Sequence, residues 1–118
     1  TTTDNIVYTA TYTPTDNVTD TANVITVTNT GVADLAGNAG LSTTDTDSYE
    51  VDTVEPTVGI SMNDTALNVG DTSTVTFTFS EEVTGFTSDD VSVESGSIGT
   101  ITTTDNIVYT ATYTPTDN

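Results

Sequence analysis

Hydrophobic and polar residues alternate with a period of two along several short stretches of the chain, and no stretch shows a helical period. Because successive side chains of a β-strand point to opposite faces, this alternation predicts half-buried strands. The clearest stretch is 72–80, where Val75, Phe77 and Phe79 are expected to face a core and the threonines between them to face solvent. The predicted strands are 6–13, 23–29, 47–52, 57–62, 72–80, 89–95, 98–103 and 106–114.

The segment TTTDNIVYTATYTPTDN occupies residues 1–17 and recurs without a change at 102–118. Identity over such a length indicates a window on a tandem array with a period of 101 residues. One period, counted from Pro56, holds seven of the predicted strands, which is typical of an immunoglobulin-like β-sandwich. We therefore expect residues 1–52 to be the C-terminal strands of one repeat and residues 53–118 the N-terminal strands of the next. Partial units of this kind could be completed by pairing between molecules, end to end.

The charge of the chain is entirely acidic, with 18 Asp and Glu, no Lys, Arg or His, and a formal net charge of −18. Its carboxylates must repel one another, be screened by salt, or share a cation. Because His and Cys are both absent, a bound metal is expected to be Ca²⁺ or Mg²⁺ rather than a softer ion. Nucleic acid and anionic membrane surfaces are unsuitable partners for such a chain, and no apolar run approaches the roughly 20 residues of a membrane span.

Three segments together resemble a known family: VDTVEPTVGI, VTFTFSEEVTGFTSDDVSVESG and GVADLAGNAG. They are similar to the bacterial Ig-like extender repeats of giant RTX-type surface adhesins. The resemblance implies an extracellular position on the bacterial cell surface, a part in cell adhesion and biofilm formation, and Ca²⁺ at the domain junctions that stiffens the array. It also implies that neighbouring identical repeats are the end-to-end partners, and that distal domains bind the final ligand.

The topology of a sandwich indicates which carboxylates could meet at a junction. The start of the first strand lies at the same pole as the loops that join strands 2–3 and 6–7, whereas the 1–2 turn lies at the opposite pole. Where units stack, the linker acids lie between these poles, and Ca²⁺ takes about six to eight oxygen ligands. The predicted ligands are Asp52, Glu55, Glu81 and Glu82, helped by Asp34, Asn38 and Asp64. The alternative is that these residues are solvated turn residues, since Asp and Asn favour turns for local reasons.

Two other classes of function compete with a structural role. Catalysis would have to use paired carboxylates, but the neighbours Glu81 and Glu82 would point to opposite faces of a strand, and no apolar pocket is indicated. We expect no enzyme activity. Direct binding of ice or another ligand could use the outward ladder of Thr72, Thr74, Thr76 and Thr78, although a twisted sheet spoils a flat array and Thr is common on solvent-facing strands. The expected function is a structural extender.

Overall fold

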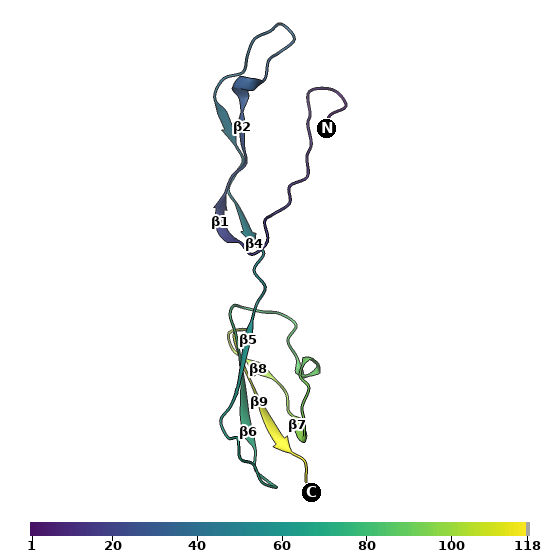
Figure 1. The fold of residues 1–118 in the computed structure, drawn as a ribbon, viewed down its shortest axis with the longest axis vertical. Coiled ribbons are helices and arrows are strands. Elements are labelled where there is room, and N and C mark those ends of the chain that lie inside the picture. Colours follow the sequence, from purple (N-terminus) through teal and green to yellow (C-terminus); the bar gives the residue numbers. More distant parts are fainter. Residues whose placement is uncertain (118) are drawn as a thin grey trace. The chain divides into compact units, whose positions relative to one another are not determined.

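The computed structural model describes residues 1–117, which divide into two compact units, residues 1–55 and 56–117. Both units are built from antiparallel strands (Figure 1). The helices among the described residues are two three-residue 3₁₀ turns, η1 (Asn29–Gly31) and η2 (Ser88–Asp90). The predicted all-β class is therefore confirmed.

The first unit contains a long, irregular hairpin with a glycine-rich tip. At its base β1 (Thr19–Asn23) pairs with β4 (Tyr49–Asp52), and further out β2 (Thr26–Thr28) pairs with β3 (Thr43–Asp45). The prediction of a strand at 47–52 is confirmed by β4.

The predicted strand 23–29 is divided between β1, β2 and η1, and β3 was not predicted. The hairpin is irregular at two places: the register of β1 against β4 shifts between Asp20 and Asn23, and the Ile25 N–H donates to the Thr46 hydroxyl at 3.0 Å instead of to a backbone carbonyl. The Asn23 side-chain amide donates to the backbone carbonyl oxygens of Asp20 at 3.0 Å and Tyr49 at 3.1 Å. A side chain that bonds to the backbone in this way competes with the regular ladder.

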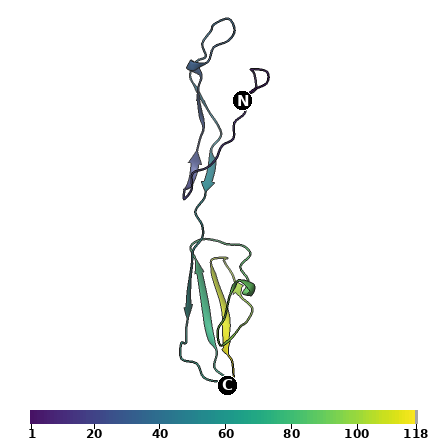
Figure 2. The ribbon, with the colours of Figure 1, turned by 45° about the vertical axis from the view of Figure 1, so that its right-hand side comes forward.

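The second unit is one antiparallel sheet with the strand order β5-β6-β9-β7 (Figure 2). The bounds of these strands are β5 (Val58–Met62), β6 (Ser73–Phe79), β9 (Val108–Pro115) and β7 (Gly96–Ile98), and a short β8 (Thr102–Thr103) also pairs with β9. The predicted strands 57–62, 72–80 and 106–114 are confirmed. The predicted strand 98–103 is instead two short pieces, because the three residues 99–101 lie opposite only two residues of β9, 111 and 112, and this bulge interrupts the ladder.

The core of the second unit lies on one face of this sheet. Val75 and Phe77 of β6 and Tyr109 and Ala111 of β9 are buried there. The ring of Phe86 packs edge-on against three aromatic rings, with centroid distances of 5.1 Å to Phe77, 5.0 Å to Phe79 and 5.2 Å to Tyr109. Each edge-to-face pair is worth about 0.5–1.5 kcal/mol beyond the burial of its area. Phe86 thus fixes the connection after β6 onto the core, and the predicted inward face of 72–80 is confirmed.

The predicted strand 89–95 is wrong. Its start is taken by η2, where the Thr87 hydroxyl accepts from the Asp89 backbone N–H at 3.3 Å and the Asp90 carboxylate accepts from the Thr87 N–H at 2.9 Å. This reciprocal capping satisfies locally the backbone groups that a strand would offer to a neighbour. Residues 91–94 then pass over the core outside any strand. The Ser95 carbonyl oxygen accepts from the Thr116 N–H at 2.9 Å, next to the Gly96–Pro115 pair of β7 and β9.

The two copies of the repeated segment have different conformations. In the second copy β9 is an inner strand, and Tyr109 is 6% exposed. In the first copy residues 6–13 form no strand, the nearest pairing is a single Thr2–Tyr8 bridge, and Tyr8 is 66% exposed. The prediction of a strand at 6–13 is therefore wrong, although its sequence is that of β9. The physical reason is that β9 has neighbours on both sides, whereas residues 1–55 supply none for the first copy.

The turn before residues 6–13 nevertheless has the same shape as the turn before residues 107–114. The Asp4 carboxylate accepts from the backbone N–H groups of Ile6 and Val7, both at 2.9 Å. Asp105 accepts in the same way from Ile107 at 3.0 Å and from Val108 at 2.9 Å. The intervening Asn5 and Asn106 both have left-handed backbones, with φ of 59° and 58°. Side-chain hydrogen bonds within the turn therefore determine its shape, while the strand that follows depends on tertiary contacts.

The repeat offers a matched pair of substitutions that tests this account. Tyr109→Ala should lower the free energy of unfolding of the sheet by about 3 kcal/mol, because it removes a buried aromatic side chain. Tyr8→Ala alters the same position of the same motif and should change it by no more than about 0.5 kcal/mol. Chemical denaturation followed by near-ultraviolet circular dichroism gives both values, and similar losses in the two variants would contradict the structure.

Candidate functional site

The predicted calcium ligands do not form one ready-made cluster within the described residues. Among residues 1–117, no three Asp or Glu side chains are grouped so that they could hold a metal ion. Asp34 and Asn38 do lie together in the hairpin tip, where the Asp34 carboxylate accepts from the Asn38 backbone N–H at 2.8 Å and from its side-chain amide at 2.9 Å. The Asn38 amide and backbone N–H hold the pKa of Asp34 below its ordinary value. Both carboxylate oxygens of Asp34 are thus already used within its own loop.

Asp52 ends β4 with one carboxylate oxygen in use. Its Oδ1 accepts from the Thr19 hydroxyl at 3.1 Å and from the Val54 backbone N–H at 3.2 Å. Both Asp52 and Glu55 are exposed. Since a carboxylate offers about four lone-pair sites, Asp52 retains acceptor capacity for a cation.

In the second unit, hydrogen bonds at the two ends of β6 locate the remaining predicted ligands. Ser80 exchanges two bonds with Thr57, from Ser80 N–H to the Thr57 carbonyl at 2.9 Å and from Thr57 N–H to the Ser80 hydroxyl at 3.0 Å. Ser80 therefore lies beside the residue that precedes β5, and Glu81 and Glu82 come directly after Ser80 in the chain. Asp64 lies at the other end of β6, where its N–H donates to the Ser73 hydroxyl at 3.0 Å. A single ion could join Asp64 to Glu81 only if the two came from different units.

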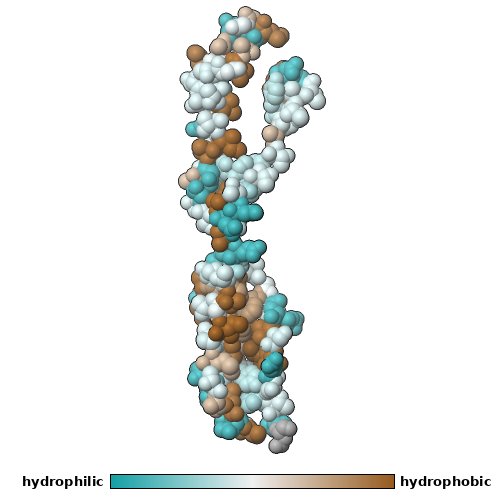
Figure 3. Space-filling model, in the orientation of Figure 1, coloured by the Kyte–Doolittle hydropathy of each residue, from teal (hydrophilic) through white to brown (hydrophobic). Residues whose placement is uncertain are grey.

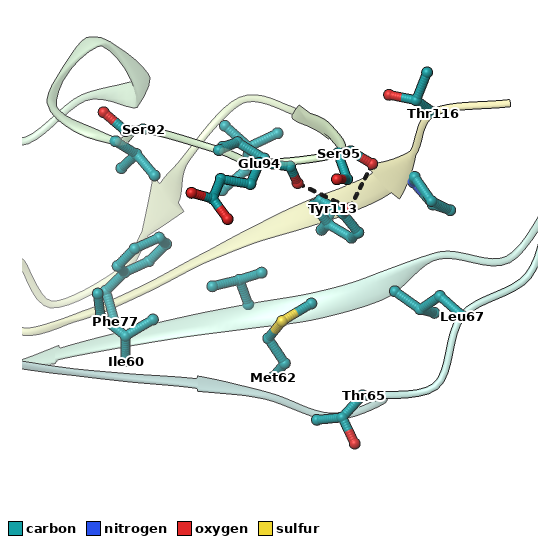
Figure 4. Close-up of a pocket in the computed structure, with 15 residues that line it drawn as sticks. Ile60, Met62, Thr65, Leu67, Phe77, Ser92, Glu94, Ser95, Tyr113 and Thr116 are labelled. Atoms are coloured by element: carbon teal, nitrogen blue, oxygen red, sulfur yellow. Dashed lines mark hydrogen bonds between the residues drawn. The ribbon is translucent and has the colours of Figure 1, made fainter. Parts of the chain in front are cut away.

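An open apolar groove lies on the core face of the second unit and was missed by the sequence analysis (Figure 4). It has a volume of about 620 Å³. One wall is the segment 91–95, held by the Tyr113 hydroxyl, which donates to the carbonyl oxygens of Glu94 at 3.2 Å and Ser95 at 2.8 Å. The lining side chains include Ile60, Met62, Leu67, Phe77, Val91 and Tyr113.

In the sequence, only the alternation of Val58, Ile60 and Met62 along β5 points to this groove. These side chains lie on the same face of the sheet as Phe77, which pairs with Ile60. All three are nevertheless exposed, and Ile60 is 64% exposed. Hydrophobic residues gather over this unit in the space-filling view (Figure 3). An apolar sheet face left open in this way indicates a surface that another element covers.

The outward threonines lie on the opposite face of β6. Thr72, Thr74 and Thr78 are exposed, and Thr76 is half-buried. Across the strand boundary Thr74 pairs with Thr112 and Thr76 with Thr110, so the threonine face extends over two strands.

The fold defines an all-β protein of immunoglobulin-like type, and comparison with known families specifies it further. The model of the bacterial Ig-like domain family matches the chain twice, over residues 1–51 and 52–118. The chain therefore belongs to the bacterial Ig-like domain family. Such domains are generally structural rather than catalytic and are often exposed on the cell surface. Searches of curated proteins and of solved structures gave no match. No helix in residues 1–117 is long and apolar enough to cross a membrane.

The turn before β9 gives a testable dependence of stability on pH. The backbone N–H groups of Val108 and Ile107 hold the pKa of Asp105 below its ordinary value of 3.8. A carboxylate with a lowered pKa in the folded state stabilises the fold above that ordinary value, and this stabilisation is lost as pH falls through the lowered pKa. Asp105→Asn should therefore lower the melting temperature at pH 6 and have little effect at pH 2.

Asp4→Asn is the matched control for this substitution, because Asp4 makes the same bonds before a segment that forms no strand. It should leave the melting temperature of the sheet unchanged at both pH values. Thermal melts from pH 2 to pH 6 measure both variants. An unaltered pH profile in Asp105→Asn would show that this turn does not contribute to the acid sensitivity.

Proposed function

We propose that this chain is a structural extender repeat of a bacterial cell-surface adhesin and that Ca²⁺ stiffens the junctions between its repeats. The observation that carries the proposal is the unchanged 17-residue segment at an offset of 101 residues, in a chain that the Ig-like family model matches twice. Repeated structural domains add length in proportion to their number. In a spacer that holds an adhesive tip away from the cell, every copy adds length, whereas a single binding site would need only one copy. On this proposal residues 1–52 and 53–118 belong to successive repeats.

The charge of the chain supports a cation at the junction. There is no Lys, Arg or His to neutralise any of the 18 carboxylates, and clustered acids repel one another over about 10 Å at 0.1 M salt. Ca²⁺ accepts carboxylate and carbonyl oxygens at about 2.3–2.6 Å and would remove this repulsion. The absence of nitrogen and sulfur ligands from His and Cys favours such a hard ion.

The local geometry supports some of the predicted ligands better than others. Glu55 directly precedes Pro56 and Thr57, and Thr57 is hydrogen-bonded to Ser80, the residue before Glu81. Asp52, Glu55, Glu81 and Glu82 therefore form the proposed core of the site, with Asp64 of a neighbouring unit as a further ligand. Asp34 and Asn38 are weaker candidates, because their polar groups already bond to each other.

The proposed mechanism is mechanical. Without Ca²⁺ the acids around the linker 52–56 repel one another and the linker flexes. With Ca²⁺ they are bridged, and the array straightens. The final adhesion target is bound by other, distal domains of the adhesin, and the partners of this unit are its neighbouring repeats.

A calcium titration of this chain tests the proposal. Ca²⁺ at 100 times its dissociation constant should stabilise the junction by about 2.7 kcal/mol, seen as a rise in melting temperature. Glu81→Gln and Asp52→Asn should each weaken Ca²⁺ binding, because each removes a proposed ligand charge. Asp89→Asn, which removes an exposed charge in η2, should not.

Two further controls separate a bound ion from screening by salt. NaCl at matched ionic strength should give a smaller stabilisation than Ca²⁺, and Glu81→Gln should leave that NaCl effect intact. Small-angle scattering of an array of several repeats should show a larger maximum dimension with Ca²⁺ than with EDTA. Equal stabilisation by NaCl, or an unchanged maximum dimension, would remove the calcium mechanism.

A further inference from the structure

Because the repeated segment is present in both units, equivalent residues of the two units can be compared. In the first unit the end of the segment is attached to the hairpin at its base. The ring of Tyr12 packs edge-on against Tyr49 of β4 with a centroid distance of 5.5 Å, and the Thr53 hydroxyl donates to the Thr15 carbonyl oxygen at 2.7 Å. The first unit thus shows how the hairpin packs against the end of this segment.

The equivalent residues of the second copy lie at the apolar groove. An offset of 101 residues relates Tyr12 to Tyr113 and Thr15 to Thr116, and both of these residues line the groove. A hairpin that packed against the second copy as 18–52 packs against the first would therefore lie over the groove. In this chain the hairpin directly follows the first copy, which makes it the element that complements the end of the repeated segment.

The hairpin and the groove are also complementary in their apolar surfaces. Val24, Ile25 and Val27 of the hairpin are all exposed. The second unit has one five-stranded sheet but no second sheet among its described residues, and an immunoglobulin-like sandwich needs two. Docking would bury both surfaces.

From these observations we propose that the groove of residues 56–117 is the docking site for the hairpin 18–52 of a second copy of this chain, so that copies associate head to tail. The proposal rests on the tandem-repeat part of the proposed function and is independent of calcium. Because each copy would offer a groove in its second unit and a hairpin in its first, association is heterologous and open-ended.

The hairpin of the same chain is tethered too closely to take this place. Docked against Thr116, the end of the hairpin would lie beyond the Ser73–Tyr113 pair, whereas β5 starts at the Val58–Phe79 pair. These two levels are separated by about nine residues of strand, or roughly 30 Å. The connection 53–57 spans roughly 18 Å when fully extended. A second copy meets no such limit.

In the proposed association, Tyr12 and its equivalent Tyr113 compete for the same partner, Tyr49. Tyr49 already packs against Tyr12 of its own chain, so docking must replace Tyr12 by Tyr113 of the other copy. Tyr12→Ala should therefore strengthen the association, while Tyr113→Ala, at the same position of the same motif, should weaken it. The acidic charge opposes association between copies, so the association should also strengthen as salt increases.

The test is sedimentation velocity over a range of concentrations, in EDTA and 0.5 M NaCl so that calcium does not contribute. The unchanged chain should form oligomers that lengthen with concentration. Ile60→Asp places a charge in the groove at a side chain that is already exposed, and it should weaken association at least tenfold. Ser61→Asp adds the same charge to the opposite face of β5 and should leave association unchanged.

Mixing two variants tests the head-to-tail geometry itself. Ile60→Asp keeps a functional hairpin, and Val27→Asp, at another exposed position, keeps a functional groove. Each should be monomeric alone, with the near-ultraviolet circular dichroism of the unchanged chain, and an equimolar mixture should form a dimer and no larger species. A chain that stays monomeric at all concentrations, or an Ile60→Asp variant that associates as the unchanged chain does, would overturn the proposal. Failure of the calcium titration would leave these outcomes unaffected.

Discussion

The fold depends on the need of every strand for a neighbour that completes its backbone hydrogen bonds. The antiparallel pairing of β6 with β9, from the Ser73–Tyr113 pair to the Thr78–Val108 pair, meets this need for the second unit and builds its core. The first copy of the β9 sequence has no such neighbour within residues 1–55 and remains exposed. Because the two copies are identical, the difference between them cannot come from intrinsic propensity and must come from tertiary contacts.

The same need connects the open groove to the repeat. The second unit has one complete sheet with an apolar face, and the first unit has a hairpin with exposed apolar side chains. In an immunoglobulin-like sandwich these two parts belong on opposite sides of one core. In the first unit the hairpin directly follows the first copy of the β9 sequence, and the second compact unit begins at Pro56.

Side-chain periodicity and local chemistry predict structure correctly where they determine it. The alternation at 72–80 identifies the buried face of β6, and the predicted opposite poles of the 1–2 turn and the 2–3 loop agree with the bonds of Ser73 and Ser80 at the two ends of β6. The predictions at 6–13 and 89–95 are wrong because the first has no neighbouring strand within residues 1–55 and the start of the second is taken by the capped turn η2. The groove could not be derived from periodicity, because the pattern of Ile60 and Met62 shows a buried face without showing what covers it.

The acidic composition makes any contact between copies electrostatically unfavourable. With no cationic side chain, contacts between copies or between repeats must overcome repulsion by burying apolar area, by screening, or by sharing a cation. The proposed apolar docking and the proposed bridging ion would therefore be separate contributions to end-to-end order. The exposed Asp52 and Glu55 precede the second unit, and the groove lies within it.

The central claim is that tertiary pairing, and not sequence, decides whether the repeated segment is a strand. Amide hydrogen exchange measured by NMR on the monomeric chain tests this most directly, since assigned resonances distinguish the two identical copies. Residues 108–114 should be protected to the level of the global unfolding of the sheet, whereas residues 7–13 should exchange at nearly the rate of an unstructured peptide. Equal protection of the two copies in the monomer would contradict the account.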